Sequence, residues 1–253
     1  MPCYINVDNK SYLDGVEISR EEFYKNLPDW KIPPTTSAPS IETFIQVFRK
    51  LIREGAKGII SIHVASQLSN IHNVAYLAAE AIKERPVKVI DSGQLTLGLG
   101  FMVLAAVKAV EMGHTLTTIV ELILEKVSHV TTIAALDTVE FLKRSGRLSY
   151  LKAELASLLD IKPILKINKG IASIELARTS RKAIERLINV IQNLGPLEYL
   201  DTVHVNAQER ALKLQEQVRH LFPLGVPVYN AEVTPAIGSH IGPGAVGFVY
   251  VTE

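Results

Sequence analysis

Residues 58–70 read GIISIHVASQLSN, and this stretch decides the fold. Its first part, residues 58–64, is a short and nearly unbroken apolar run that begins at a glycine, the pattern of a strand buried on both faces. The chain turns polar at Ser66, and Ser69 is a good N-cap for a helix that carries apolar residues at helical spacing. A strand that leads through a hydroxyl-rich turn into a helix predicts one unit of an α/β fold.

The same unit recurs along the N-terminal half of the chain. Besides the strand at 58–64 we expect these elements: a helix at 41–52, a strand at 87–90, a helix at 98–112 and a helix at 115–127. Apolar strands alternating with helices predict a parallel sheet covered on both faces. Ligands of such sheets sit at the carboxyl ends of the strands, which here are residues 66–70 and 92–96.

The C-terminal half has a different pattern. Residues 163–167 and 171–177 flank Asn168-Lys169-Gly170, a strong hairpin signal. The other elements expected here are strands at 130–136, 202–205, near 228 and at 246–251, and helices at 137–143, 151–159, 181–193 and 208–221. We therefore predict an α/β protein of two lobes. Residues 1–128 form an N-terminal parallel-sheet α/β/α lobe, and residues 129–253 form a C-terminal α+β lobe with an antiparallel sheet.

Residues 1–33 are short of apolar periodicity and rich in turns. We expect a strand at 4–7 and a second short strand near Tyr12, and Pro33 and Pro34 rule out regular helix after them.

Composition excludes several function classes. The 253 residues carry a formal net charge of +1, and no dense Lys/Arg block occurs, which argues against a general nucleic-acid binder. Cys3 is the one cysteine, so cysteine-rich zinc motifs are excluded. The N-terminus lacks the pattern of a signal peptide. The most apolar stretch, residues 95–107, is shorter than the ~20 residues of a membrane helix, so we expect a cytoplasmic protein without stable membrane insertion.

Signatures of common enzymes are missing from the sequence. It contains no phosphate-binding P-loop, no Gly-x-Ser-x-Gly elbow and no His-Glu-x-x-His zinc helix. Gly98-Leu99-Gly100 begins like a dinucleotide-binding pattern, but no third glycine follows. These absences count against the common phosphate-binding enzymes, hydrolases with a nucleophile elbow and zinc-dependent proteases.

Four segments place hydroxyls or small residues at the ends of strands: 34–40 (PTTSAPS), 66–70 (SQLSN), 91–93 (DSG) and 240–244 (HIGPG). The first two precede helices, whose first N–H groups and positive dipole end favour a carboxylate. Thr and Ser hydroxyls add donors without adding a charge. Together these segments indicate a site for a ligand with an anionic head.

The four segments, taken in order with two others, resemble the DegV family of bacterial fatty-acid-binding proteins. The two others are LKRSGRL at 142–148 and LLDIKPIL at 158–165. The resemblance covers nearly the whole chain. It implies two α/β lobes with one long-chain fatty acid in a buried pocket between or beneath them.

The resemblance also implies roles for individual residues. Thr36 and Ser69 match the residues that contact the fatty-acid carboxylate, and Arg147 and His240 match residues near the head group or a kinase-docking face. The expected ligand site is completed by Ser37, Ser66, Asn70, Ser92 and Gly242. Such proteins present the fatty acid to a separate ATP-dependent kinase, which makes acyl phosphate for phospholipid metabolism. The resemblance then implies a carrier protein and not an enzyme, with the fatty acid as its ligand and no cofactor.

The sequence departs from the family pattern in two places. The family normally starts with a strand that ends in Asp-Ser, and we expect the lobe at 1–128 to lack it. Asn70-Ile71 stands where the family usually has Gly-Thr, which removes a hydroxyl and adds bulk near the carboxylate.

Two other functions remain open from the residues alone. The first is a small-molecule enzyme, a kinase or hydrolase, that uses the polar cluster of Ser69, Asp91 and His240. The second is an interaction module without a ligand.

Overall fold

The computed structural model describes residues 1–146 and 161–253. The chain forms two compact units. The first unit comprises Met1, Ala38–His129 and Asn168–Ile171, and the second comprises Pro2–Ser37, Val130–Ile167 and Ala172–Glu253.

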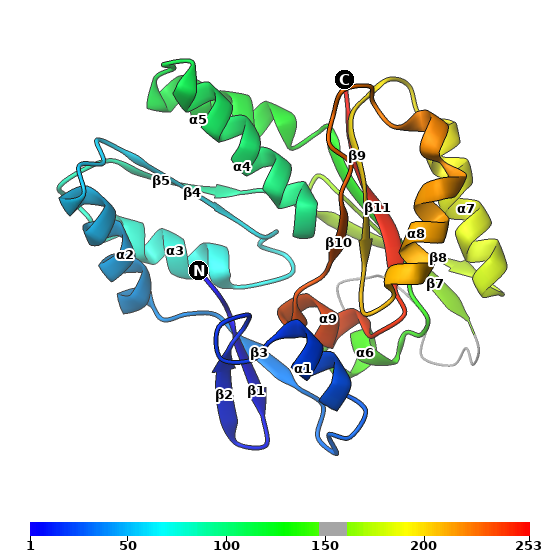
Figure 1. Ribbon diagram of the computed structural model, residues 1–253. Helices are drawn as coiled ribbons and strands as arrows, with labels where there is room; N and C mark the ends of the chain where they lie inside the picture. Colours follow the sequence, from blue (N-terminus) through cyan, green and yellow to red (C-terminus); the bar gives the residue numbers. More distant parts are fainter. Residues whose placement is uncertain (147–160) are drawn as a thin grey trace. The chain divides into compact units, whose positions relative to one another are not determined.

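A parallel pair of strands lies at the centre of the first unit. Strands β4 (Ile59–His63) and β5 (Val87–Asp91) run in parallel register, from Ile59 opposite Val87 to His63 opposite Asp91. Helices α2 (Ile41–Arg53) and α3 (Ile71–Glu80) lie on one side of the pair, and α4 (Thr96–Glu111) and α5 (Leu116–Lys126) lie on the other (Figure 1). The predicted parallel α/β/α arrangement is confirmed.

Local signals set where these helices begin. The Ser40 hydroxyl accepts from Thr43 N at 3.2 Å at the start of α2, and the Thr115 hydroxyl accepts from Thr118 N at the start of α5. The prediction for α3 is wrong by one residue, because Asn70 and not Ser69 is its N-cap. Asn70 has φ −75° and ψ 0° rather than an extended conformation, and its side chain makes no capping bond.

The first unit also holds the tip of a hairpin. Gly170 N donates to Gly93 O at 3.1 Å, and both glycines have positive φ. A Cβ on Gly93 would lie 2.7 Å from Gly170 N, so a side chain cannot fit between these two backbones.

A mixed sheet organises the second unit, with the strand order β10-β9-β11-β6-β7-β8. The strands are β6 (Val130–Ala135), β7 (Lys162–Asn168), β8 (Ile171–Ala177), β9 (Leu197–His204), β10 (Asn230–Glu232) and β11 (Val246–Thr252). Strand β11 is antiparallel to both β6 and β9, which confirms the predicted antiparallel component. Strand β10 is parallel to β9, a pairing that the sequence did not predict.

Two helices cover one face of this sheet (Figure 1). Helices α7 (Ser180–Gln192) and α8 (Gln208–Gln217) lie side by side there. Leu187 and Leu214 pack with Ile133, Leu200 and Phe248 in one buried cluster. A 3₁₀ turn at Arg219–Leu221 follows α8, which therefore ends before the predicted residue 221.

A smaller sheet of order β2-β1-β3 forms from residues near the N-terminus. Its strands are β1 (Tyr4–Val7), β2 (Lys10–Leu13) and β3 (Thr35–Ser37), and β1 pairs antiparallel with both others. The expected strands at 4–7 and near Tyr12 are confirmed.

Three short helices of the second unit complete the described elements: α1 (Arg20–Asn26), α6 (Glu140–Arg144) and α9 (Pro235–Ile241). Helices α1 and α9 were not predicted from the sequence. The helix predicted at 151–159 lies outside the described residues.

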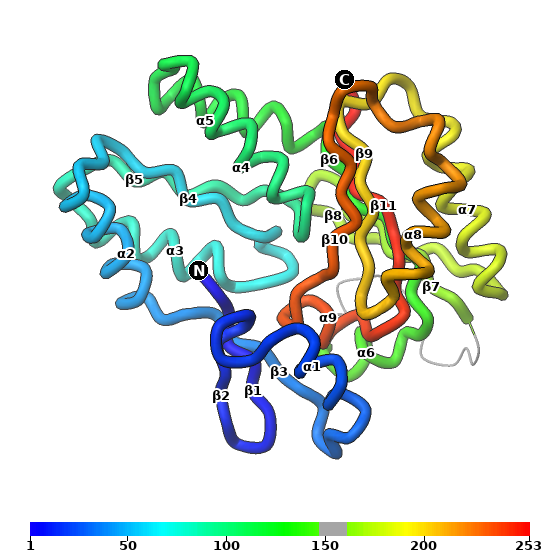
Figure 2. Tube along the Cα trace, in the orientation of Figure 1, coloured from blue at the N-terminus to red at the C-terminus, as the bar shows by residue number. Residues whose placement is uncertain are grey.

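Residues 2–37 group with the C-terminal half of the chain. Helix α1 and strand β1 contact α9, so the two ends of the second unit's sequence lie side by side (Figure 2). The predicted division at residue 129 matches the point where the main part of the first unit ends, but that division assigned residues 1–37 to the N-terminal lobe. The division into two domains stays a prediction.

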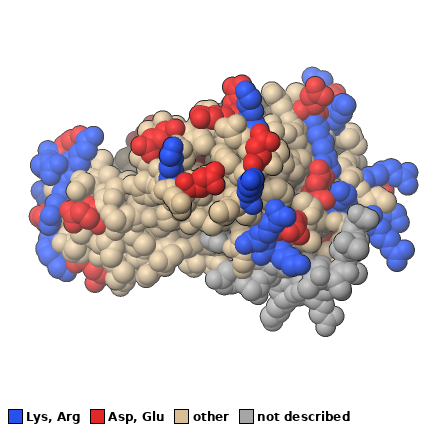
Figure 3. All heavy atoms as spheres, turned by 90° about the horizontal axis from the view of Figure 1, so that it is seen from below, with Lys and Arg blue, Asp and Glu red and all other residues tan. Residues whose placement is uncertain are grey.

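Figure 3 shows Lys and Arg close to Asp and Glu over parts of the face that it draws, and other parts of that face without charged side chains. Within residues 1–146 and 161–253, no helix combines enough length with enough apolar character to span a bilayer.

Candidate functional site

Two of the predicted site residues meet in the second unit. Thr36 Oγ1 on β3 lies 3.0 Å from His240 Nε2 on α9, and both side chains are half-buried. Side chains alternate along a strand, so Ser37 points to the other side of β3, where its hydroxyl accepts from Asn6 Nδ2 at 3.4 Å. The structure thus brings together Thr36, which the resemblance matches to a carboxylate contact, and His240, which it places near the head group or a kinase-docking face.

Helix α9 places His240 through its two ends. Pro235 occupies the first helical position, where its missing N–H costs nothing. The helix ends at Gly242, whose φ is 78° and whose N–H donates to Gly238 O at 2.8 Å. A Cβ on Gly242 would run into the ring of Phe141, so this predicted site residue acts by letting the backbone pass close to Phe141.

The remaining described site residues gather at the strand ends of the first unit. Asp91, at the end of β5, accepts from Ser66 N at 3.1 Å and from Gly93 N at 2.8 Å. Its carboxylate therefore ties the turn after β4 to the turn after β5, as expected for the carboxyl ends of neighbouring parallel strands.

The serine hydroxyls and the asparagine amide of these turns differ in their exposure and in their hydrogen bonds. Ser92 is fully buried, and its hydroxyl contacts the backbone of Gln94 in the same turn. Ser69 is half-buried and accepts from Ile71 N at 3.3 Å, which leaves its hydroxyl proton for another acceptor. Ser66 and Asn70 are exposed. Arg147 lies outside the described residues.

A buried histidine lies just before these turns. His63 is 7% exposed, and its Nε2 lies 2.7 Å from Ser61 Oγ. Burial, with a contribution from nearby His72, lowers the pKa of His63 to about 4, so the ring is neutral at physiological pH. His63 was not among the site residues predicted from the sequence.

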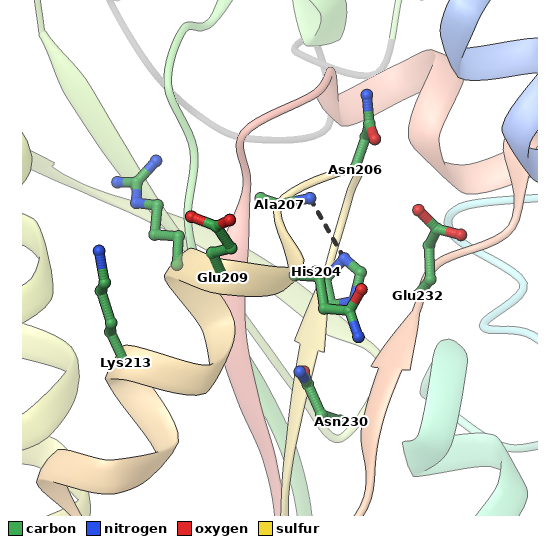
Figure 4. Close-up of a pocket in the computed structure, with 9 residues that line it drawn as sticks. His204, Asn206, Ala207, Glu209, Lys213, Asn230 and Glu232 are labelled. Atoms are coloured by element: carbon green, nitrogen blue, oxygen red, sulfur yellow. Dashed lines mark hydrogen bonds between the residues drawn. The ribbon is translucent and has the colours of Figure 1, made fainter.

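The structure also contains a polar cavity of about 710 Å³ that was not predicted from the sequence (Figure 4). It lies where β9, β10 and the start of α8 meet. Its lining includes His204, Lys213, Asn230 and Glu232 but none of the predicted site residues. His204 is buried, its Nδ1 accepts from Ala207 N at 3.3 Å, and burial lowers its pKa. The sequence around His204 does not indicate a site, because His204 lies inside an apolar strand sequence.

No metal-binding cluster occurs in the described part of the chain, since no three His, Cys, Asp or Glu side chains there are grouped to hold an ion.

The whole chain matches a known family. Residues 1–253 match the model of the family described as "Uncharacterised protein, DegV family COG1307". A DegV domain-containing protein of Streptomyces coelicolor is 32% identical over 252 residues, which cover 98% of this chain and 89% of that protein. One from Listeria innocua is 33% identical over 257 residues, covering 99% of this chain and 89% of that protein.

Solved structures show the same fold. The structure reported as "Fatty Acid Binding of a DegV family Protein from Thermus thermophilus" has a TM-score of 0.89 and 29% identity, covering 100% of this chain and 91% of that one. A structure described as DegV, a fatty acid binding protein from Bacillus subtilis, has a TM-score of 0.89 and 28% identity over the same shares. With a family match over its full length and relatives above 30% identity, this chain belongs to the DegV family.

Proposed function

We propose that this chain binds one long-chain fatty acid and presents its carboxylate to a separate ATP-dependent kinase. The fatty-acid part is supported by the two DegV structures whose names state fatty-acid binding and which this chain matches over its full length. The single observation that carries the proposal is the Thr36–His240 pair, because a hydroxyl and an imidazole at 3.0 Å form a compact donor set for a carboxylate.

The chemistry of this pair suits a carboxylate that must be handed on. A hydroxyl accepts and donates at once, so Thr36 can accept from His240 Nε2–H while its own proton binds a carboxylate oxygen. Hydroxyl donors bind the head group without a fixed ion pair, which leaves its oxygens able to react with a phosphoryl donor.

The other site assignments rest on the family motifs. Ser69 is proposed to donate its free hydroxyl proton to the head group, and Arg147 is proposed to lie near it or near the kinase. Ser37, Ser66, Asn70, Ser92 and Gly242 are proposed to shape the turns around these groups.

Apolar burial would supply most of the affinity. Each CH₂ group of the acyl chain that leaves water contributes about 0.8 kcal/mol. A head group held by two or three hydrogen bonds then sets orientation more than total affinity.

A binding experiment tests the proposal at Thr36. Delipidated protein is titrated with palmitate or oleate, and the Kd is compared among wild type, Thr36→Ala, Ser69→Ala and Thr35→Ala. Thr35 is a matched control, since it neighbours Thr36 on β3 but is exposed. We expect Thr36→Ala and Ser69→Ala each to raise the Kd about three- to tenfold, and Thr35→Ala to leave it unchanged. Equal Kd values for Thr36→Ala and Thr35→Ala would contradict the assignment.

A second experiment tests whether the chain presents its fatty acid to a kinase, the proposed role in phospholipid metabolism in the cytoplasm. The fatty-acid-loaded chain is incubated with ATP, with and without a kinase that acts on protein-bound fatty acids. Acyl phosphate is expected only when chain, kinase and ATP are all present. Acyl phosphate or ester cleavage from the chain alone would favour the enzyme alternative. An absence of lipid binding would favour the interaction module.

A further inference from the structure

Three side chains from residues 2–37, the N-terminal segment, bind backbone atoms shortly before His240. Arg20 Nη1 donates to Glu232 O at 2.7 Å, Tyr24 Oη donates to Val233 O at 2.9 Å, and Asp14 Oδ2 accepts from Ala236 N at 2.9 Å. We call Asp14, Arg20 and Tyr24 the clamp. All three bonds span more than 200 residues of sequence, and Figure 2 shows the two segments side by side.

The clamp lies in a partly dehydrated setting. Tyr24 is 5% exposed, and burial raises the pKa of its phenol, with Glu232 and Asp14 adding to the rise. The phenol therefore keeps its proton and acts as a donor. Burial also raises the pKa of Asp14, although the Ala236 N–H, the Thr234 side chain and Arg20 act in the opposite direction. Asp14 Oδ1 is buried and has no hydrogen-bond partner among the described residues.

The Tyr24 side chain packs directly against the backbone of α9 at Gly238. A Cβ on Gly238 would collide with the Tyr24 hydroxyl and would lie 2.8 Å from its Cε1 atom. Gly238 is two residues before His240, so the position of Tyr24 sets the position of the turn that carries the imidazole.

The same N-terminal segment also carries Thr36. Strand β3 pairs with β1, where Thr36 lies opposite Ile5, and β1 continues through β2 to Asp14. One segment therefore holds the hydroxyl of the pair directly and holds the histidine of the pair through the backbone of α9.

We propose that the clamp is a positioning device for His240: it fixes α9 so that the imidazole meets Thr36 at the fatty-acid head group. This inference rests on the proposed function, in which Thr36 and His240 bind the carboxylate. Helix α9 has seven residues, too short to be stable alone, so its placement depends on contacts such as these.

Conservative variants test the clamp. In Tyr24→Phe the ring stays and the bond to Val233 O is lost. In Asp14→Asn the shape stays, but the charge-assisted bond from Ala236 N is replaced by a weaker neutral one. The matched controls are Tyr76→Phe, an exposed tyrosine on α3, and Asp29→Asn, an exposed aspartate after α1. We expect each clamp variant to raise the Kd for oleate about three- to tenfold and the controls to stay within twofold of wild type. Melting temperature is recorded for every variant, and if Asp14→Asn does not fold, Tyr24→Phe alone decides.

A double-mutant cycle separates positioning from general support. Each clamp variant is combined with His240→Ala. If the clamp acts through His240, the combined variants bind no more weakly than His240→Ala alone. Two results would overturn the inference while the proposed function stands, provided that His240→Ala itself weakens binding. In the first, the clamp variants bind as tightly as wild type. In the second, they add their full effect to that of His240→Ala. If wild type itself binds no fatty acid, the proposed function fails and this inference fails with it.

Discussion

Asp201 shows how a single buried residue can carry a measurable pH dependence. Its side chain on β9 is 1% exposed, Oδ1 accepts from Tyr229 N at 2.6 Å, and Oδ2 has no partner within the described residues. Burial raises its pKa from 3.8 to about 6, because one hydrogen bond does not replace the water that a carboxylate loses.

The sign of the effect follows from the raised pKa. The folded protein binds a proton at Asp201 more tightly than the unfolded chain does. Its contribution to stability is therefore fully present below the unfolded pKa and is lost as the pH rises through about 6. Asp201→Asn removes this titration and can keep the bond from Tyr229 N.

We predict that the unfolding free energy of wild type, relative to Asp201→Asn, increases by about 2 kcal/mol as the pH falls from about 7.5 to 4. Urea unfolding at several pH values measures it. The exposed Asp29→Asn variant keeps Asp201 and is the control, so its unfolding free energy should retain the pH dependence of wild type. A wild-type to Asp201→Asn difference that is the same at every pH would contradict the assigned pKa.

The sequence motifs predicted individual residues of the site but not the residues that hold them in place. Thr36 and His240 were named from the sequence, and the structure places them 3.0 Å apart. Asp14 and Tyr24 were not, because their partners are backbone atoms more than 200 residues away and no local pattern encodes such a contact.

At the scale of elements, two glycines test how tightly the turns of the first unit are packed. Gly93 follows β5 with φ +59°, and a Cβ there would lie 2.7 Å from Gly170 N. Gly100 lies inside α4, and a Cβ there would meet nothing within 4 Å.

We expect Gly93→Ala to lower the unfolding free energy by about 2 kcal/mol or more, from a strained φ and a displaced hairpin tip. Gly100→Ala should be neutral or stabilising by up to about 1 kcal/mol, because alanine favours helix over glycine. Thermal unfolding of both variants measures the pair. Similar melting temperatures would show that the Gly93–Gly170 contact is not tight.

Helices and strands with a clear apolar period or a clear turn motif were predicted from the sequence. Short helices, in which no period can stand out, were not. The hairpin around Lys169 and Gly170 was predicted from turn chemistry, and both residues have the positive φ that such a turn needs. Helix α1 was missed although Ser19 and Glu22 form a capping pattern, with Glu22 N donating to Ser19 Oγ at 3.1 Å. Its seven residues are too few for a helical period to stand out.

At the scale of the whole molecule, the sequence predicted the α/β class and the family, and the division of the chain into two domains stays a prediction. Residues 2–37 were expected in the N-terminal lobe, yet they pack in the second unit against α9. Their sequence is rich in turns and shows no long apolar period, although Ile5 and Phe23 are fully buried, so local pattern does not say which part of the chain they pack against. Such long-range packing follows from the folded structure and not from local pattern.

The most direct test of the central claim is to extract purified, never-delipidated protein with organic solvent and to identify bound lipid by mass spectrometry. A Thr36→Ala, Ser69→Ala double variant is treated in parallel, with Thr35→Ala as the control. The account predicts close to one long-chain fatty acid per chain in wild type and in Thr35→Ala, and much less in the double variant. No fatty acid in any of the three proteins, together with no rise in melting temperature when oleate is added, would contradict it.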